Sequence, residues 1–187
     1  MVNISFNDKT METLRSLVGK TFESFDCDSF IYSPTVYGII GLHINGETYK
    51  ITCNFNSVQR FFHLEDVAVL RFDECQPSDI VSRMDDGKLI NNSVNDTIIG
   101  IDVVNDIESV THDNNELNLC STKGLIFHFA SGNELSFEVG TWFTELITIQ
   151  KGYDLISKFV PISDFYEEWN EDGGYIPKSQ REIVTLN

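Results

Sequence analysis

The chain contains 187 residues, of which 41% are hydrophobic and 12% aromatic, so it has enough apolar side chains to fold around a core. Its 29 acidic residues outnumber its 13 basic residues, which gives a formal net charge of −16. The resulting negative field repels phosphate backbones and anionic lipid surfaces. We therefore expect neither a nucleic-acid partner nor a membrane partner.

The N-terminal residues and the cysteines both favour a cytoplasmic protein. Residues 1–17 are acidic and polar where a secretory signal peptide needs a basic start and an unbroken apolar segment. No apolar run in the sequence reaches the length of a membrane span. In the cytoplasm, the thiols of Cys27, Cys53, Cys75 and Cys120 are expected to stay reduced. No two of them have the Cys-x-x-Cys spacing of zinc or redox sites, and we expect no metal and no cofactor.

The first predicted element is a short N-terminal helix over residues 8–18. Asn7 is suited to cap its N-terminus, Met11 and Leu14 share one face, and Gly19 can end it. Residues 20–30 then alternate aromatic and acidic side chains, which favours a strand. The helix is expected to cover one face or end of a sheet.

Residues 37–51 predict a β-hairpin that turns at Asn45-Gly46, because Asn-Gly between two apolar runs is a strong signal for a two-residue turn. A third strand is predicted over residues 67–72. Residues 123–139 predict a second hairpin, in which alternating apolar side chains flank Ser131-Gly132, and residues 146–149 predict its third strand. Each half of the chain is therefore expected to contain a three-stranded meander.

The two meanders align without a gap, which suggests an internal duplication. The matched positions are Gly38 with Gly124, Ile40 with Ile126, Gly46 with Gly132, Tyr49 with Leu135, and Ile51 with Phe137. The alternative is that any two hairpins of equal length share a glycine and an apolar period. Both interpretations stay open at this point.

A single compact domain over residues 1–187 is expected, with meander halves at about 20–75 and 96–152 and a C-terminal extension at 153–187. Residues 76–95 contain the richest group of turn-forming residues and are predicted to connect the halves. After them, residues 97–104 form an apolar run that predicts a buried strand, with a continuation past a bulge over residues 107–110.

The C-terminal extension is predicted to contain a short helix over residues 165–169, capped by Ser163 or Asp164 and ended by Gly173-Gly174, and a final edge strand over residues 183–186. Phe165 and Trp169 lie four residues apart, so they should share the helix face that packs on the sheet. The fold class that follows is mainly β, all-β or α+β, with antiparallel hairpins forming a sandwich or open barrel and a short helix near each end.

No catalytic or metal-binding motif stands out in the sequence. His43, His63, His112 and His128 show none of the spacings typical of zinc sites, and there is no Gly-x-Ser-x-Gly elbow. Our first hypothesis is therefore a non-catalytic binding protein that engages a basic protein partner through its acidic surface, in the manner of an inhibitor or immunity protein. The acidic residues expected to form that surface are Asp164, Glu167, Glu168, Glu171 and Asp172.

The alternative hypothesis is a small-molecule-binding protein or enzyme with a cleft between the two meanders. His128, Trp142 and Phe143 are the residues expected to line such a cleft, together with nearby carboxylates. A convergent pocket with perturbed titrations would favour this alternative, and a packed interior with a flat acidic face would favour the protein-binding hypothesis.

Overall fold

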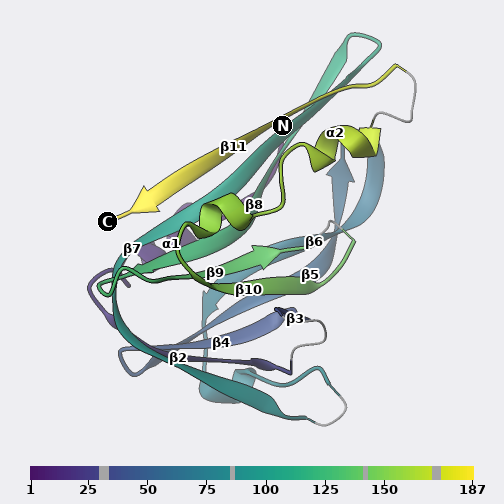
Figure 1. Ribbon diagram of the computed structural model, residues 1–187. Helices are drawn as coiled ribbons and strands as arrows, with labels where there is room; N and C mark the ends of the chain where they lie inside the picture. Colours follow the sequence, from purple (N-terminus) through teal and green to yellow (C-terminus); the bar gives the residue numbers. More distant parts are fainter. Residues whose placement is uncertain (30–33, 85–86, 141–142, 170–173) are drawn as a thin grey trace.

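The computed structural model describes residues 1–29, 34–84, 87–140, 143–169 and 174–187 (Figure 1). It confirms the mainly β fold, built on antiparallel strands. The strands are β1 (Val2–Ile4), β2 (Thr21–Asp28), β3 (Thr35–Tyr37), β4 (Ile39–Ile44), β5 (Glu47–Arg60), β6 (His63–Glu74), β7 (Leu89–His112), β8 (Asn115–Phe129), β9 (Glu134–Val139), β10 (Leu146–Gly152) and β11 (Ile176–Leu186). The helices are α1 (Asp8–Arg15) and α2 (Asp164–Trp169), with short 3₁₀ turns η1 (Pro77–Asp79) and η2 (Leu155–Lys158).

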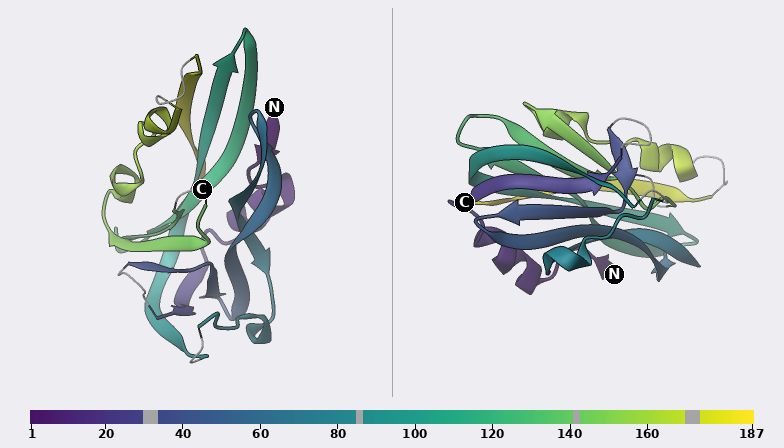
Figure 2. Two further views of the ribbon diagram at one scale, coloured as in Figure 1. Left: turned by 90° about the vertical axis from the view of Figure 1, so that its right-hand side faces the viewer. Right: turned by 90° about the horizontal axis from the view of Figure 1, so that it is seen from below.

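The strands form one continuous sheet in the order β3-β10-β9-β8-β7-β2-β4-β5-β6. The sheet folds back on itself, so that β2 faces β8 and β9 across the main hydrophobic core. Phe22 lies edge-on to Phe127 at a centroid distance of 5.2 Å, and Phe25 lies edge-on to Phe137 at 5.8 Å. Alternation along each strand places one side chain in two on this inner face. The two layers are visible in Figure 2.

Strand β7 joins the two layers. Its first part pairs with β2 and its second part pairs with β8, with register shifts at Ile98/Gly100 and Val104/Asn105. Bulges of this kind bend a strand and increase its twist. Beyond the bend, β11 pairs with β7 from Ile101 to Thr111 and takes the place beside β7 that β2 has left.

The prediction that residues 76–95 are a connection is wrong at its C-terminal end, since β7 already begins at Leu89. The turn-forming asparagines are accommodated there by pairing with β2: Asn91 lies opposite Asp26, and its amide donates to the Asp26 carboxylate at 2.7 Å. Local composition favoured a turn, but the cross-strand partner stabilises a strand.

Both predicted hairpins are confirmed as β4–β5 and β8–β9. Asn45 and Gly46 have φ angles of 52° and 77°, the left-handed values that a two-residue turn of type I′ requires. The second hairpin closes differently, because Phe129 pairs with Asn133 and leaves a three-residue turn that contains Gly132 at a φ of 87°.

This difference in turn length shifts the match between the meanders by one residue in the first strand. The gapless alignment fails there, because Ile40 lies in the main core while Ile126 lies on the opposite face of the sheet. With the shift, Ile40 corresponds to Leu125, and His43 corresponds to His128.

The corrected match also extends to a pair of polar residues. His43 contacts Asp26 at 2.7 Å, and His128 contacts Asp102 at 2.8 Å. In both pairs the aspartate lies on the neighbouring strand, opposite the residue two positions before the histidine. The third strand of each meander, β6 or β10, pairs with the second strand of its hairpin. These registers favour the duplication, which stays a prediction.

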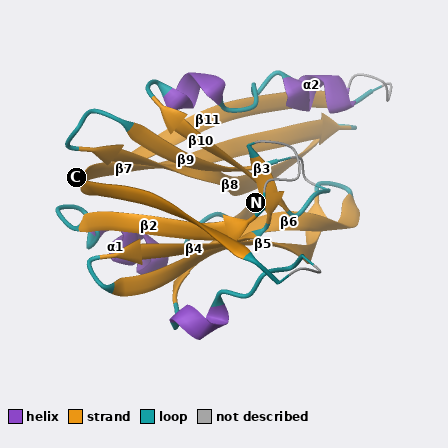
Figure 3. Cartoon of the chain, turned by 60° about the horizontal axis from the view of Figure 1, so that its bottom comes forward, coloured by secondary structure: helices purple, strands orange, loops and turns teal. Residues whose placement is uncertain are grey.

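The helices lie on the outside of the layers (Figure 3). Helix α1 begins as predicted at Asn7, whose side chain accepts a hydrogen bond from the Thr10 amide at 2.9 Å, and it ends at Arg15, before the predicted end at residue 18. Helix α2 packs Phe165 and Trp169 inward, as predicted. The final strand is longer than predicted, and Gly173 lies outside the described residues. All four cysteines are free thiols, with Cys27 and Cys53 buried in the main core.

Candidate functional site

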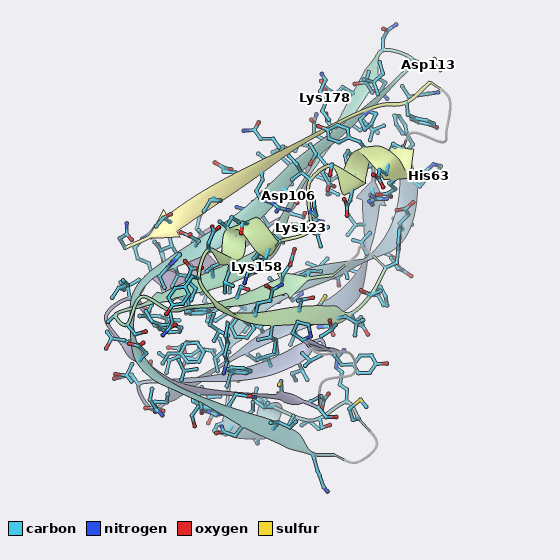
Figure 4. The ribbon with its side chains drawn as sticks, viewed as in Figure 1. His63, Asp106, Asp113, Lys123, Lys158 and Lys178 are labelled. Carbon is cyan, nitrogen blue, oxygen red and sulfur yellow. The ribbon has the colours of Figure 1, made fainter. Side chains whose placement is uncertain are left out.

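The outer face of β7 and β8 carries a group of charged side chains under the C-terminal segment. These residues, called the acid–base cluster below, are Asp106, Glu108, Lys123, Glu138 and Arg181. They come from four strands: β7, β8, β9 and β11. Figure 4 shows Asp106 and Lys123 beneath the polypeptide that runs from η2 through α2 to β11.

The period of two along β7 places this cluster between two apolar clusters. Val104, Asp106, Glu108 and Val110 project from the same face of the strand. Val104 packs with Leu155 and its neighbours beneath η2, whereas Val110 packs beneath α2. The two carboxylates are therefore held in a strip with an apolar cluster at each end.

A cavity of about 280 Å³ opens between this strip and residues 160–168, and we refer to it as the C-terminal cavity. Its lining combines the acid–base cluster with apolar and acidic side chains of the C-terminal segment. The described residues that line it are Asp106, Glu108, Lys123, Glu138, Val139, Gly140, Phe143, Val160, Pro161, Ile162, Asp164, Phe165, Glu168 and Arg181. An apolar wall with a few convergent polar groups is typical of small-molecule sites.

Arg181 and Asp106 form the strongest ion pair of the cluster. The Nε and Nη2 atoms of Arg181 donate to the two carboxylate oxygens of Asp106, each at 2.8 Å. This bidentate geometry is the most favourable one for arginine and a carboxylate. It fixes β11 to the second part of β7, and the guanidinium balances the negative charge of Asp106.

Glu108 is held less tightly. It is 4% exposed, and the distance from its Oε1 to the Lys123 ammonium is 4.0 Å, at the outer limit of an ion pair. Its Oε2 is buried and has no hydrogen-bond partner among the residues that the structure describes. A buried carboxyl oxygen without a partner is costly, since it has lost its hydration without gaining a replacement.

The carboxyl group of Glu138 accepts one hydrogen bond from the Val160 amide, at 2.6 Å. Desolvation raises the pKa of Glu138 and that of Glu108 to about 7. Desolvation likewise lowers the pKa of the Lys123 ammonium. Both carboxyls therefore exchange protons near neutral pH, a property that clusters at functional sites.

Arg60 forms the rim of the cluster nearest α2. Its guanidinium is only 2% exposed, binds Glu168 at 2.6 Å and Glu65 at 3.3 Å, and stacks within 6 Å of Phe61, Phe143 and Trp169. Glu168 is thereby held at the edge of the cavity, where its side chain is partly exposed. The short helix is attached to the sheet by both charge and aromatic packing.

The acidic residues predicted to bind a basic protein do not form one uniform surface. Asp164 and Glu167 are exposed on α2, whereas Glu168 is engaged by Arg60. Glu171 and Asp172 lie outside the described residues.

The residues predicted to line a cleft between the meanders are also separated. The main core contains residues of both meanders and fills much of the space between them. Phe143 lines the C-terminal cavity instead, and Trp142 lies outside the described residues. His128 lies away from this cavity, where its Nε2 contacts Asp102 at 2.8 Å and its Nδ1 contacts Glu134 at 3.4 Å.

The acid–base cluster was not predicted from the sequence, because its members are spread over four strands. One local signal was present: Asp106 and Glu108 occupy the same period-two positions as Val104 and Val110. When charged residues alternate on the same strand face as buried apolar residues, that face is expected to be covered by another part of the chain.

In the part of the chain that the structure describes, no three histidine, cysteine or acidic residues are grouped as a metal site would require. Nor does any described helix have the length and apolar character needed to cross a membrane. Comparisons with protein families, with curated proteins and with solved structures gave no match to this chain.

Proposed function

We propose that the protein binds a small organic molecule in the C-terminal cavity. The observation that carries this proposal is the buried carboxyl group of Glu108, a residue of the cavity lining whose Oε2 has no hydrogen-bond partner among the described residues. A bound molecule would supply the missing partner. A small-molecule site was the alternative hypothesis from the sequence, and we now place it in the C-terminal cavity.

The size and lining of the cavity support the proposal. Its volume of about 280 Å³ is close to the lower end of ordinary ligand pockets, which begin at about 300 Å³. Phe143 and Phe165 supply aromatic surface for an apolar body, and the acid–base cluster supplies polar groups for a head. The ligand expected here is compact, with a ring or short aliphatic body and one polar end.

Electrostatics also argue for a role beyond stability. Burying several charged groups together is expensive, and apolar residues of similar volume often stabilise a fold as well or better. The bidentate pair of Arg181 and Asp106 can be explained as an attachment for β11, but Glu108 and Glu138 have no bidentate partner in the described part of the chain. Their burial is best explained by a molecule that binds to them.

The proposal is tested with three probes that share one phenylethyl body: 2-phenylethylamine, 2-phenylethanol and phenylacetate. Amide chemical shifts are recorded in ¹H–¹⁵N spectra at millimolar probe concentrations. We expect at least one probe to shift amides of the cavity lining. The shifts should be lost in Val160→Phe, which fills the cavity, and kept in Val81→Phe, which enlarges an exposed valine outside the lining.

Failure of all three probes to shift those amides would contradict the proposal. So would shifts that persist unchanged in Val160→Phe, because they would place the probe elsewhere.

Binding of a basic protein remains a separate prediction. Its acidic surface on α2 is reduced to Asp164 and Glu167 among the described residues that are not already paired. A charge-reversal test should therefore change Glu167 alone, since reversing Glu168 would also break its contact with Arg60 and disturb the fold.

A further inference from the structure

We propose that the ligand of the C-terminal cavity carries a positively charged amino group that Glu108 and Glu138 hold. This inference rests on the proposed function and names the chemical class of the ligand. It follows from the charges of the lining, from how those charges are already paired, and from the buried Glu108 oxygen for which the described residues offer no hydrogen-bond partner.

The lining is strongly acidic. Among the described residues that line the cavity, five carry carboxyl groups and two carry positive charges. The carboxyl groups are those of Asp106, Glu108, Glu138, Asp164 and Glu168, and the positive charges are those of Lys123 and Arg181. A surface with this excess attracts cations and repels anions.

Both positive charges of the lining are held against carboxylates. Arg181 uses two of its donors on Asp106, at 2.8 Å each. Lys123 lies 4.0 Å from Glu108 and is also within the electrostatic influence of Asp106. An anionic head group would have to compete with these carboxylates and would lie close to Glu138, so a carboxylate or phosphate ligand is disfavoured.

An ammonium group fits what the two glutamates lack. It presents three donors and no acceptor, so it can give one hydrogen bond to the carboxylate of Glu108 and another to the carboxylate of Glu138. Such charge-assisted bonds are about twice as strong as neutral ones. The aromatic and aliphatic wall formed by Phe143, Val139 and Ile162 would receive the body of the molecule.

Binding of an amine should also release protons. The carboxyl of Glu108 is influenced by Lys123, Arg60, Asp106 and Glu168, and burial outweighs the two positive groups. The carboxyl of Glu138 is influenced in the same way by Arg181, Asp106 and Lys123. An ammonium ion binds the ionised forms, so its affinity should rise as the pH passes through about 7 and these carboxyls lose their protons.

The test measures the affinities of 2-phenylethylamine, 2-phenylethanol and phenylacetate by titration calorimetry at about pH 6 and about pH 8, on either side of the carboxyl pKa values. We expect the amine to bind about tenfold or more tightly than the alcohol and the carboxylate at about pH 8. We also expect its affinity to fall several-fold at about pH 6, where the amine itself stays charged.

Glu108→Gln and Glu138→Gln keep the shape of the side chains and remove their charge. Each should weaken binding of the amine about tenfold or more and should reduce its dependence on pH. Glu116→Gln is the matched control, because Glu116 lies on β8 outside the cavity, where it contacts Lys178. It should leave the affinity unchanged.

The outcomes separate this inference from the proposed function. If the alcohol or the carboxylate binds in the cavity more tightly than the amine, the cationic head is wrong and the small-molecule site stands. If the amine binds best but neither glutamine variant weakens it, the assignment to Glu108 and Glu138 is overturned. If no probe binds, the proposed function itself fails.

Discussion

Arg60 lies where the acid–base cluster meets α2, and it combines packing with charge. Its guanidinium is buried among Phe61, Phe143 and Trp169 and binds Glu168 at 2.6 Å. The aliphatic stem of an arginine contributes to packing independently of its charge. At the scale of one residue, the two contributions can therefore be separated by substitution.

We predict that Arg60→Ala lowers the free energy of unfolding by about 2–4 kcal/mol, because it removes both the packed stem and the partner of Glu168. Arg60→Met keeps most of the stem and should cost clearly less, since Glu168 is 35% exposed and can regain water. Urea denaturation followed by far-UV circular dichroism measures both values.

Arg15→Ala serves as the control, because Arg15 is exposed at the end of α1, and it should change stability by less than about 0.5 kcal/mol. If Arg60→Met proves as destabilising as Arg60→Ala, the charge rather than the packing dominates at this position.

At the scale of elements, side-chain contacts reinforce the pairing of β11 with β7. Arg181 binds Asp106 near the middle of β11, and near its end the Thr185 hydroxyl donates to Asp102 at 2.6 Å. The same aspartate contacts His128 of β8 at 2.8 Å. The hydrogen bond with Asp102 raises the pKa of His128, and that with His128 lowers the pKa of Asp102.

These shifts define a pH window for the contact between His128 and Asp102. Since the pKa of Asp102 is lowered in the fold, its contribution is present above the unfolded value of about 3.9 and is lost as the pH falls through the folded value. Since the pKa of His128 is raised, its contribution is complete below the unfolded value of about 6.5 and is lost as the pH rises through the folded value. Glu134, at 3.4 Å from the ring, acts in the same direction.

We predict that His128→Gln destabilises the protein more at about pH 5.5 than at about pH 8.5, because the ion pair exists only while the histidine is charged. Urea denaturation midpoints of the wild type and the variant at the two pH values measure the difference. His63→Gln, at an exposed position of β6, should show no such dependence. An equal loss at both pH values would mean that His128 acts through packing alone.

The sequence predicted those elements that are fixed by neighbours along the chain. The hairpin at Asn45-Gly46 needs only a turn with positive φ and two alternating strands, and both are local properties. The start of β7 was missed because Asn91 is stable in a strand only through its contacts with β2. The acid–base cluster depends on four strands that come together only after the sheet bends. The spacing of residues along the sequence does not show which strands come together.

At the scale of the whole molecule, β7 determines whether the two halves can act separately. The strand pairs with β2 in one layer and with β8 in the other, and the main core contains residues from both halves. Unfolding either half would therefore remove a hydrogen-bonded neighbour and a packed face from the other. We expect one cooperative unit over the whole chain, although its two meanders have matching registers.

Native-state hydrogen exchange tests this expectation. Ile51 of β5 is fully buried in the main core, and Ile51→Val should lower stability by about 1 kcal/mol. If the chain is one unit, the slowest amides of β8 and β9 should lose the same free energy of opening as those of β4 and β5. Ile147→Val, at an equally buried position of β10, should act reciprocally on β4 and β5. If amides of the unsubstituted half keep their full protection, each meander opens on its own. The strand β7 would then not couple the two halves.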